Sequence, residues 1–112
     1  MKSLKNRVRL IGQVGQETTV TVLGRSDMVA RFPLATHECY WNAKGERQTR
    51  THWHRLVAWG KTAEDVELEV FKGMPLAIEG RLVSRSYQGK DGTKHHVTEV
   101  IVHGILPVGQ GY

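Results

Sequence analysis

The sequence predicts an all-β fold, a small barrel of five strands with one α-helix between the third and fourth strands. Apolar and polar residues alternate with a period of two along most of the 112-residue chain, as they do in half-buried strands. Residues 62–73 instead carry apolar side chains at helical spacing. The length suits one domain, and we expect it to cover residues 1–106, followed by a short flexible end at 107–112.

Turn residues divide the alternating stretches into five predicted strands, which cover residues 7–14, 31–36, 51–59, 76–82 and 99–103. Pro33 cannot donate a backbone hydrogen bond, so the second strand lies at an edge or is bulged there. The helix is expected to have Thr62 as its N-cap and Gly73 as its stop signal. Residues 85–97 are expected to form a long hairpin with its tip at 88–92, where Asp-Gly is a turn signal.

Five strands with a helix after the third is the order of an OB-fold, a Greek-key barrel whose open face binds oligonucleotides. The charge distribution is consistent with such a ligand. The chain carries a formal net charge of +5, although residues 61–72 hold two lysines against four acidic residues. One acidic element on an otherwise basic body favours a polyanionic partner.

The third predicted strand carries the most informative side chains. Trp53, Arg55 and Trp59 lie on one face of it, because neighbouring residues of a strand point to opposite faces. Bases stack on aromatic rings, and a guanidinium group pairs with phosphate or stacks in its turn. The strand is therefore a candidate nucleic-acid surface. The alternative is a strand whose tryptophan face is covered by another element.

The sequence contains no set of residues that indicates catalysis or a metal site. Gly60-Lys61-Thr62 is similar to the end of a phosphate-binding loop, but the glycine which that motif needs is Arg55 here. His52 and His54 share a strand face, yet no cysteine pair or acidic residue stands at ligand spacing. We therefore predict no enzymatic activity, no metal and no cofactor.

The cellular compartment is predicted from two features. Cys39 is the only cysteine, which excludes an intrachain disulfide and fits a reducing compartment, and no activating partner for its thiol is evident. The first residues lack the apolar core of a signal peptide, and no run is long enough for a transmembrane helix. We expect a cytoplasmic protein with no membrane contact.

Six segments in order resemble the bacterial single-stranded DNA-binding protein (SSB) family, namely residues 6–15, 32–36, 51–64, 72–73, 78–82 and 98–100. The resemblance implies an OB-fold that binds single-stranded DNA without sequence specificity in replication, recombination and repair, usually as a homotetramer. The base-stacking positions of the family fall on Trp53, Trp59, Tyr40 and Tyr87. Trp41 could share the role of Tyr40, but adjacent residues point opposite ways, and the motif favours Tyr40.

Basic residues accompany the aromatic ones. Tyr87 lies near the start of the hairpin that also holds Arg85, Lys90 and Lys94, and such a hairpin can close over a bound strand or be a solvated loop. The complete set of predicted DNA-binding residues is Trp53, Trp59, Tyr40, Tyr87, Arg55, Trp41, Arg85, Lys90 and Lys94.

Assembly and partners are also predicted. The first strand carries Ile11 on an otherwise polar face and invites edge pairing with a second copy. The resemblance implies that such dimers pair face to face, with contacts near His54, so we expect a homotetramer or, failing that, a dimer. The SSB family usually ends in an acidic tip that recruits enzymes, whereas this sequence ends at Tyr112 without one, so recruitment is not expected to carry over. Two alternatives stay open: a primosomal replication-restart adaptor with an OB-fold, and an RNA-binding OB module.

Overall fold

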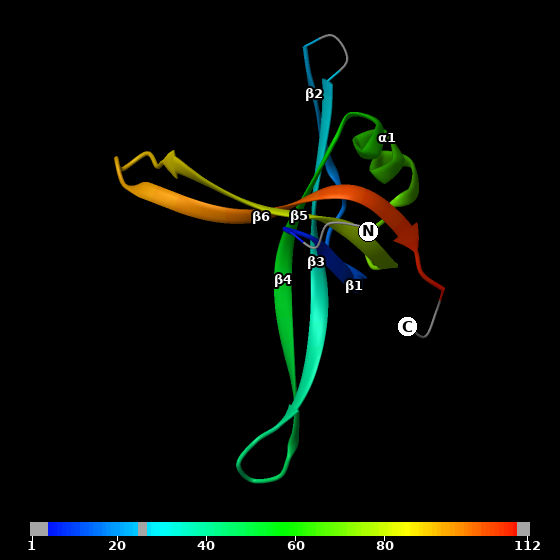
Figure 1. The fold of residues 1–112 in the computed structure, drawn as a ribbon, viewed down its shortest axis with the longest axis vertical. Helices are drawn as coiled ribbons and strands as arrows, with labels where there is room; N and C mark the ends of the chain where they lie inside the picture. The colour runs from blue at the N-terminus through cyan, green and yellow to red at the C-terminus, as the bar shows by residue number, and fades with distance from the viewer. Residues whose placement is uncertain (1–4, 25–26, 110–112) are drawn as a thin grey trace.

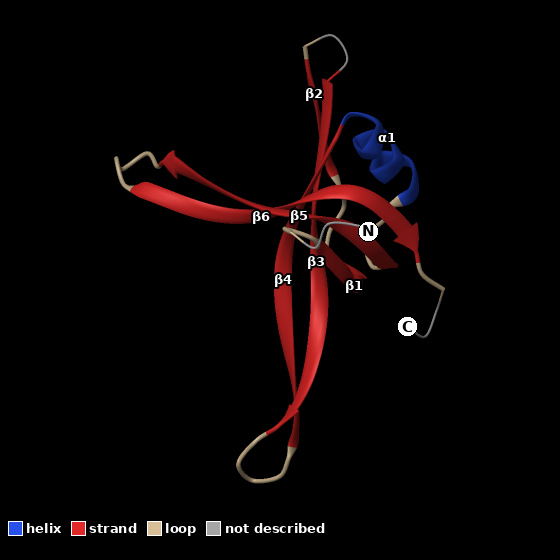
Figure 2. Cartoon of the chain, viewed as in Figure 1, coloured by secondary structure: helices blue, strands red, loops and turns tan. Residues whose placement is uncertain are grey.

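A computed structural model describes residues 5–24 and 27–109, and in those ranges it contains six strands and one helix. The elements in chain order are β1 (Val8–Val14), β2 (Thr19–Leu23), β3 (Asp27–Trp41), β4 (Arg47–Trp59), α1 (Gly60–Glu69), β5 (Pro75–Gln88) and β6 (Lys94–Pro107). Figure 2 shows that strands make up most of the chain and that α1 stands at one side of them.

Five of the strands close into a barrel. They follow the order β1-β5-β6-β4-β3, and β3 pairs back to β1 at residues 13–14. The strand pairs are antiparallel except β4–β6, which is parallel and joined at Leu56↔Val100 and Val57↔Ile101. In chain order the helix lies between β4 and β5, which are the third and fourth of the five ring strands. The predicted OB-fold is therefore confirmed.

The sequence pattern did not reveal β2. This strand pairs with β3 outside the ring, from Thr19↔Arg31 to Leu23↔Asp27. Its side chains are exposed apart from the partly buried Val20, so no buried face marks it in the sequence. The predicted second strand, residues 31–36, is the middle of the much longer β3.

Pro33 has no backbone N–H, and it lies at a position of β3 where no neighbouring strand needs a hydrogen bond from that residue. It lies between the segment of β3 that pairs with β2 and the segment that pairs with β1. Its carbonyl oxygen accepts a hydrogen bond from the Gly15 N–H at 3.0 Å, so its nitrogen faces the same side, away from β4.

The predicted start and stop of the helix are wrong. α1 begins at Gly60, with Trp59 as N-cap and no capping side chain, so Thr62 lies inside the first turn. Gly60 has φ +58°, a conformation that favours glycine and turns the chain directly from β4 into the helix. The helix ends at Glu69, and Gly73 instead forms a later turn, donating its N–H to the Val14 carbonyl at 2.7 Å.

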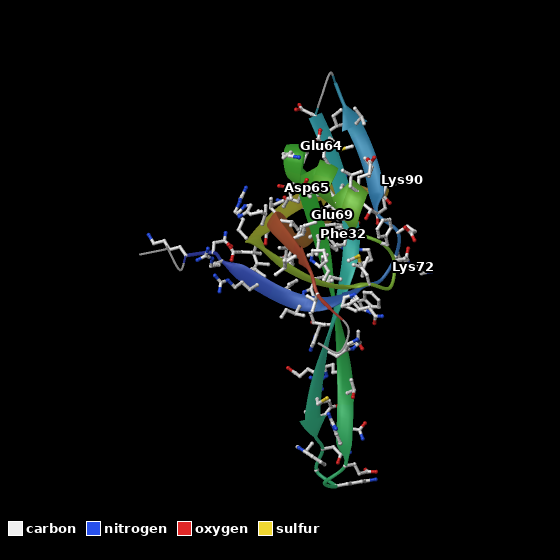
Figure 3. The ribbon with its side chains drawn as sticks, turned by 90° about the vertical axis from the view of Figure 1, so that its right-hand side faces the viewer. Phe32, Glu64, Asp65, Glu69, Lys72 and Lys90 are labelled. Carbon is white, nitrogen blue, oxygen red and sulfur yellow. The ribbon has the colours of Figure 1, made fainter. Side chains whose placement is uncertain are left out.

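The core fills the barrel with the inward-facing residues of the ring, and α1 adds its own apolar face. Leu34, Leu56 and Leu76 are fully buried, and Ala63 and Val66 of α1 join the same cluster. In Figure 3 the acidic side chains of α1, among them Glu64, Asp65 and Glu69, lie on the helix away from the core. The acidic element predicted from composition is thus the outer side of the helix that packs on the barrel.

Three hairpin arms extend beyond the barrel, formed by β2–β3, β3–β4 and β5–β6 (Figure 1). The radius of gyration is 16.2 Å. A compact chain of this length is expected to measure about 13 Å. The tip of the β5–β6 arm is the predicted Asp-Gly turn, with Gly92 at φ +82° and the Asp91 carboxylate accepting the Thr93 N–H at 2.9 Å.

The far end of the chain continues the path of β6. Pro107 is the last residue of that strand, and the Val108 N–H donates to the Pro75 carbonyl at 3.4 Å. The rest of the predicted flexible end, residues 110–112, lies outside the described residues. In residues 5–24 and 27–109 no helix is long and apolar enough to span a membrane.

Candidate nucleic-acid interface

The outer face of β4 exposes the aromatic side chains that the sequence singles out. β4 pairs continuously with β3, and its residues Leu56 and Ala58 are buried inside the barrel. Trp53 and Trp59, on the opposite face with Arg55, are 63% and 47% exposed. No other element of the described chain covers the two rings to the degree that core packing requires, so the covered-face alternative does not hold for this chain.

The indole of Trp53 packs closely against Gly15. A Cβ atom placed on Gly15 would overlap the outer edge of the indole ring and would stand 3.4 Å from the Pro33 ring. The backbone at the end of β1 therefore forms the floor on which the indole rests, and a residue outside the predicted site shapes it.

A hollow of about 330 Å³ opens beside Arg55 on the outer side of the barrel. Three arginines line it, Arg31 from β3, Arg55 from β4 and Arg85 from β5, together with two carboxylates, Glu17 and Glu99. Arg85 is ion-paired with Glu99, whereas Arg31 and Arg55 form no ion pair in the part of the chain that the structure describes. Two uncompensated guanidinium groups thus face a space large enough for a phosphate group.

A second hollow, of about 340 Å³, lies on the other side of Arg55. Trp53 and Arg55 form one wall, and Val97 and Thr98 of β6 are among the residues of the other. Because Arg55 lines both hollows, they are neighbours along β4. Together they provide a path between the β4 surface and the β5–β6 arm, with cations and an exposed ring along it.

The β5–β6 arm presents a third aromatic residue. Tyr87 stacks on His95, its cross-strand partner, with ring centroids 5.3 Å apart and an interplanar angle of 24°. The Arg85 guanidinium carbon lies 5.8 Å from the centroid of the Tyr87 ring. Lys94 lines a hollow next to Tyr87, and Lys90 is exposed in the tip of the arm. The arm therefore brings Arg85 and Tyr87 together on one face and adds His95, which sequence reasoning missed. Lys94 pairs with Gln88 and so lies on the opposite face of the arm.

Tyr40 and Trp41 lie on opposite faces of the β3–β4 arm. The register pairs Trp41 with Arg47 and so places Trp41 on the same sheet face as Trp53, where it is exposed. Tyr40 is on the other face, and its ring lies 4.7 Å from the guanidinium carbon of Arg50. The preference for Tyr40 stays a prediction. Trp41 shares a sheet face with Trp53 but lies further along the β3–β4 arm, because Trp53 pairs with Ala35 and not with a residue next to Trp41.

Three titratable groups of β3 and β4 have altered pKa values: Cys39, Arg47, whose pKa the Cys39 contact raises, and His54. Hydrogen bonds from Arg47, at 3.3 Å, and with Thr49, at 4.0 Å, lower the pKa of the Cys39 thiol. The expectation that Cys39 lacks an activating partner is therefore wrong, because the arm pairs it with a guanidinium 8 residues away. Burial, and next the charge of His52, lowers the pKa of His54, whose Nε2 lies 2.8 Å from the Thr36 hydroxyl.

The pKa of His54 predicts a pH dependence of stability. Because the folded state disfavours protonated His54, the unfolded state takes up the proton first as the pH falls below about 6.5. The free energy of unfolding should then decrease as the pH falls from about 7.5 to about 5.5, measured by urea denaturation. His54→Gln should reduce this decrease, and His96→Gln, at an exposed position, should not. A His54→Gln variant with the wild-type pH dependence would contradict the assignment.

A closed five-stranded barrel with one helix and with indole and guanidinium groups on its outer face defines a protein of the OB-fold class. The family model described as the single-strand binding protein family matches residues 5–108. The chain belongs to the single-strand binding protein family, as its sequence motifs indicate.

Curated relatives agree with this assignment. Single-stranded DNA-binding protein 1 of Chlorobaculum tepidum is 40% identical over 105 residues, which are 93% of this chain and 65% of that protein. The single-stranded DNA-binding protein of Neisseria meningitidis serogroup A is 34% identical over 104 residues, covering 93% of this chain and 60% of that protein. The chain thus spans less than two thirds of the length of either relative.

Solved structures show the same fold. The Plasmodium falciparum SSB, in a complex with ssDNA, is 30% identical and superimposes with a TM-score of 0.86, covering 97% of this chain and 98% of that one. A deletion mutant of the single-stranded DNA binding protein from Thermus aquaticus is 23% identical, with a TM-score of 0.82 over 94% of this chain and 51% of that one. The second similarity supports the fold alone.

Proposed function

We propose that this protein binds single-stranded DNA without sequence specificity, as a non-catalytic protein of the cytoplasm that acts in replication, recombination and repair. The observation that carries the proposal is the exposure of Trp53 and Trp59 on one face with Arg55 between them. Exposed indole rings cost free energy in water and are suited to stacking on bases, which is tolerant of sequence. The Plasmodium falciparum structure of the same fold, a complex with ssDNA, supports this ligand.

The residues suggest two stages of binding. Arg31 and Arg55 attract the phosphate backbone into the hollows beside β4, releasing counterions from the DNA. Bases then stack on the rings of β4 and on Tyr87 of the arm, each worth about 1–3 kcal/mol. Lys90 and Lys94 add positive charge on the arm, where the strand would leave the barrel.

Titration of the intrinsic tryptophan fluorescence with poly(dT) at several salt concentrations tests the proposal. We expect quenching on binding, with a slope of log affinity against log salt of about −0.7 for each phosphate neutralised. Poly(U) as competitor addresses the RNA alternative, and we expect it to compete more weakly. Absence of quenching, an affinity that ignores salt, or equal competition by poly(U) would contradict the proposal.

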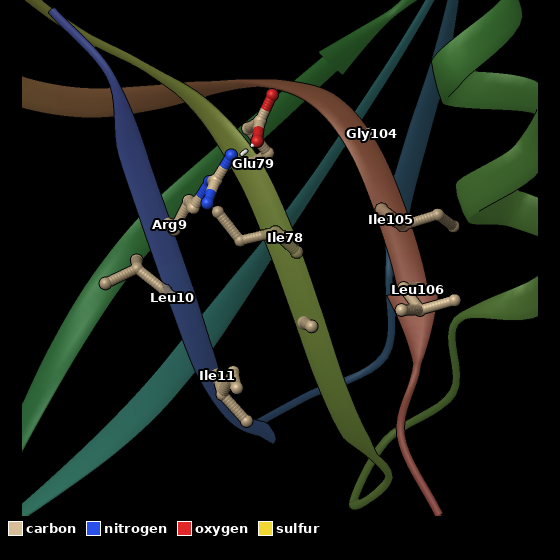
Figure 4. Close-up of a pocket in the computed structure, with 9 residues that line it drawn as sticks. Arg9, Leu10, Ile11, Ile78, Glu79, Gly104, Ile105 and Leu106 are labelled. Carbon is tan, nitrogen blue, oxygen red and sulfur yellow. Dashed lines mark hydrogen bonds and ion pairs between the residues drawn. The ribbon is translucent and has the colours of Figure 1, made fainter. Parts of the chain in front are cut away.

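Assembly into a homotetramer, or a dimer, is part of the proposal and is supported by the surface of β1, β5 and β6. A hollow of about 320 Å³ lies there, lined by Ile11, Ala77 and Leu106, and bordered by an Arg9–Glu79 ion pair of 2.9 Å (Figure 4). β1 also pairs with β3 at residues 13–14 only, which leaves the outer edge of its earlier residues without a strand partner in the described chain. A second copy of this chain would cover both the apolar surface and the open edge.

Replacing Leu106 by glutamate tests this assembly. The side chain is 67% exposed in the single chain, so the substitution should leave the barrel folded and should place a charge in the proposed interface. Light scattering at micromolar concentration should then give a smaller particle than wild type. Leu68→Glu is the matched control, since Leu68 is 73% exposed on α1, away from this surface. An unchanged mass for Leu106→Glu would exclude the surface as the contact.

A further inference from the structure

We propose that Glu99 is a positioning residue of the DNA-binding face: it holds Arg85 in place so that Arg85 supports the Tyr87 ring instead of neutralising phosphate. The inference rests on the proposed function and names a residue that acts on the ligand through its neighbours. Glu99 places a carboxylate in a surface that is proposed to bind a polyanion.

Glu99 is the one charged residue that is buried among residues 5–24 and 27–109, at 7% exposure. It lies on β6, opposite Val83 of β5, and lines the same hollow as Arg31 and Arg55. A buried carboxylate loses its hydration, and this one also stands where phosphate is expected to bind. Both costs need a compensating contact, and the structure provides one.

Arg85 compensates the carboxylate with two contacts. Its Nε donates to Oε1 at 3.0 Å, and its Nη2 lies 3.5 Å from Oε2. The register places Arg85 and Glu99 on one face of the β5–β6 arm, two positions apart along the ladder. Two parallel contacts orient a guanidinium plane more strictly than one, so Glu99 determines where Arg85 points.

The guanidinium group of Arg85 also contacts the ring of Tyr87. Its carbon lies 5.8 Å from the ring centroid, within the range of a cation–π interaction, and the ring itself stacks on His95. The sequence of contacts Glu99, Arg85, Tyr87 and His95 therefore runs along one face of the arm. A ring held in this way loses less side-chain freedom when a base stacks on it.

The three arginines of the hollow thus have different roles. Arg31 and Arg55 form no ion pair in the described residues and are available to phosphate. Arg85 is already neutralised by Glu99, so removing it should remove support for Tyr87 and leave the count of neutralised phosphates unchanged. The salt dependence of binding distinguishes these roles, because its slope reports that count.

A double-mutant cycle on the full chain tests the inference, with poly(dT) affinity and its salt slope as readouts. Glu99→Gln and Arg85→Ala should each weaken binding about two- to fivefold, the size of one exposed cation–π contact. The double variant should be no weaker than Arg85→Ala alone, and Arg85→Ala should add nothing in a Tyr87→Leu background. Arg85→Ala should keep the wild-type salt slope, whereas Arg55→Ala should reduce it by about 0.7.

Controls separate positioning from net charge and from folding. Glu67→Gln removes one negative charge from the exposed side of α1 and should leave poly(dT) binding close to wild type. Thermal unfolding and light scattering confirm that each variant is folded and assembled. If Glu99→Gln does not fold, Arg85→Lys replaces it, because lysine keeps the charge without the two-pronged contact and should bind like Arg85→Ala.

Two results would overturn the inference while leaving the proposed function intact. Tighter binding by Glu99→Gln, both alone and combined with Arg85→Ala, would show that Glu99 only repels phosphate. A salt slope reduced by Arg85→Ala as much as by Arg55→Ala would make Arg85 a phosphate contact. Failure of the proposed function itself would appear differently, as wild-type protein that does not bind poly(dT).

Discussion

The double variant Trp53→Ala, Trp59→Ala should lose about 2–6 kcal/mol of poly(dT) binding free energy, about 1–3 from each ring. Both rings are largely exposed on the outer face of β4, so their removal takes stacking surface from the ligand and little packing from the barrel. Each single variant should lose about half as much. Competition with labelled oligo(dT) is the measurement, because the double variant lacks most of the intrinsic tryptophan fluorescence.

Phenylalanine at the same two positions is the matched control. It keeps an aromatic face, although a smaller one, and should recover most of the affinity that alanine loses. A folded double-alanine variant that binds as tightly as wild type would remove β4 from the binding surface. The arm residues around Tyr87 would then be the remaining aromatic candidates.

Leu56→Ala should lower the free energy of unfolding by about 2–5 kcal/mol, because it leaves a cavity in a core that is otherwise closely packed. Leu56 lies on the inner face of β4, adjacent to Arg55 in sequence, and is 1% exposed. Urea denaturation of wild type and variant at the same protein concentration measures the loss with the contribution of assembly held equal.

Trp53→Ala on the opposite face of the same strand is the control for this measurement. It removes a larger side chain, yet it should cost less stability than Leu56→Ala, since much of the indole is already in water. Equal losses of stability for the two variants would mean that Trp53 is a core residue. The comparison therefore tests directly which side of β4 faces the interior.

The alternation of β4 made both its faces predictable. Leu56 and Ala58 face the interior, whereas Trp53, Arg55 and Trp59 on the other face are exposed, and Val57 is the one residue of that face between Trp53 and Trp59 that is buried. β2 lacks this contrast because nearly all of its side chains are exposed. The helix start was misplaced because a glycine in a left-handed conformation, and not a capping side chain, turns the chain at Gly60.

The contacts of the β5–β6 arm depend on a register that the sequence does not determine to one residue. The sequence suggests a tip at 88–92, whereas the strands end at Gln88 and resume at Lys94, so the tip is residues 89–93. A shift by one residue changes every cross-strand pair. The ends of the predicted hairpin, residues 85 and 97, are cross-strand partners in the structure, whereas the predicted tip alone would not place Tyr87 opposite His95.

Neighbouring strands of the barrel differ in how many residue pairs join them, and the proposed binding site lies over one of the shortest ladders, β4–β6. Long ladders connect β3 to β4 and β5 to β6, but β4 meets β6 through the pairs Leu56↔Val100 and Val57↔Ile101 alone in the described chain. The arginine-lined hollow spans this joint, with Arg31 and Arg55 on one hairpin and Arg85 on the other. A nucleic-acid strand bound there would contact both the β3–β4 hairpin and the β5–β6 hairpin. DNA binding and the closed form of the barrel would then stabilise each other through thermodynamic linkage.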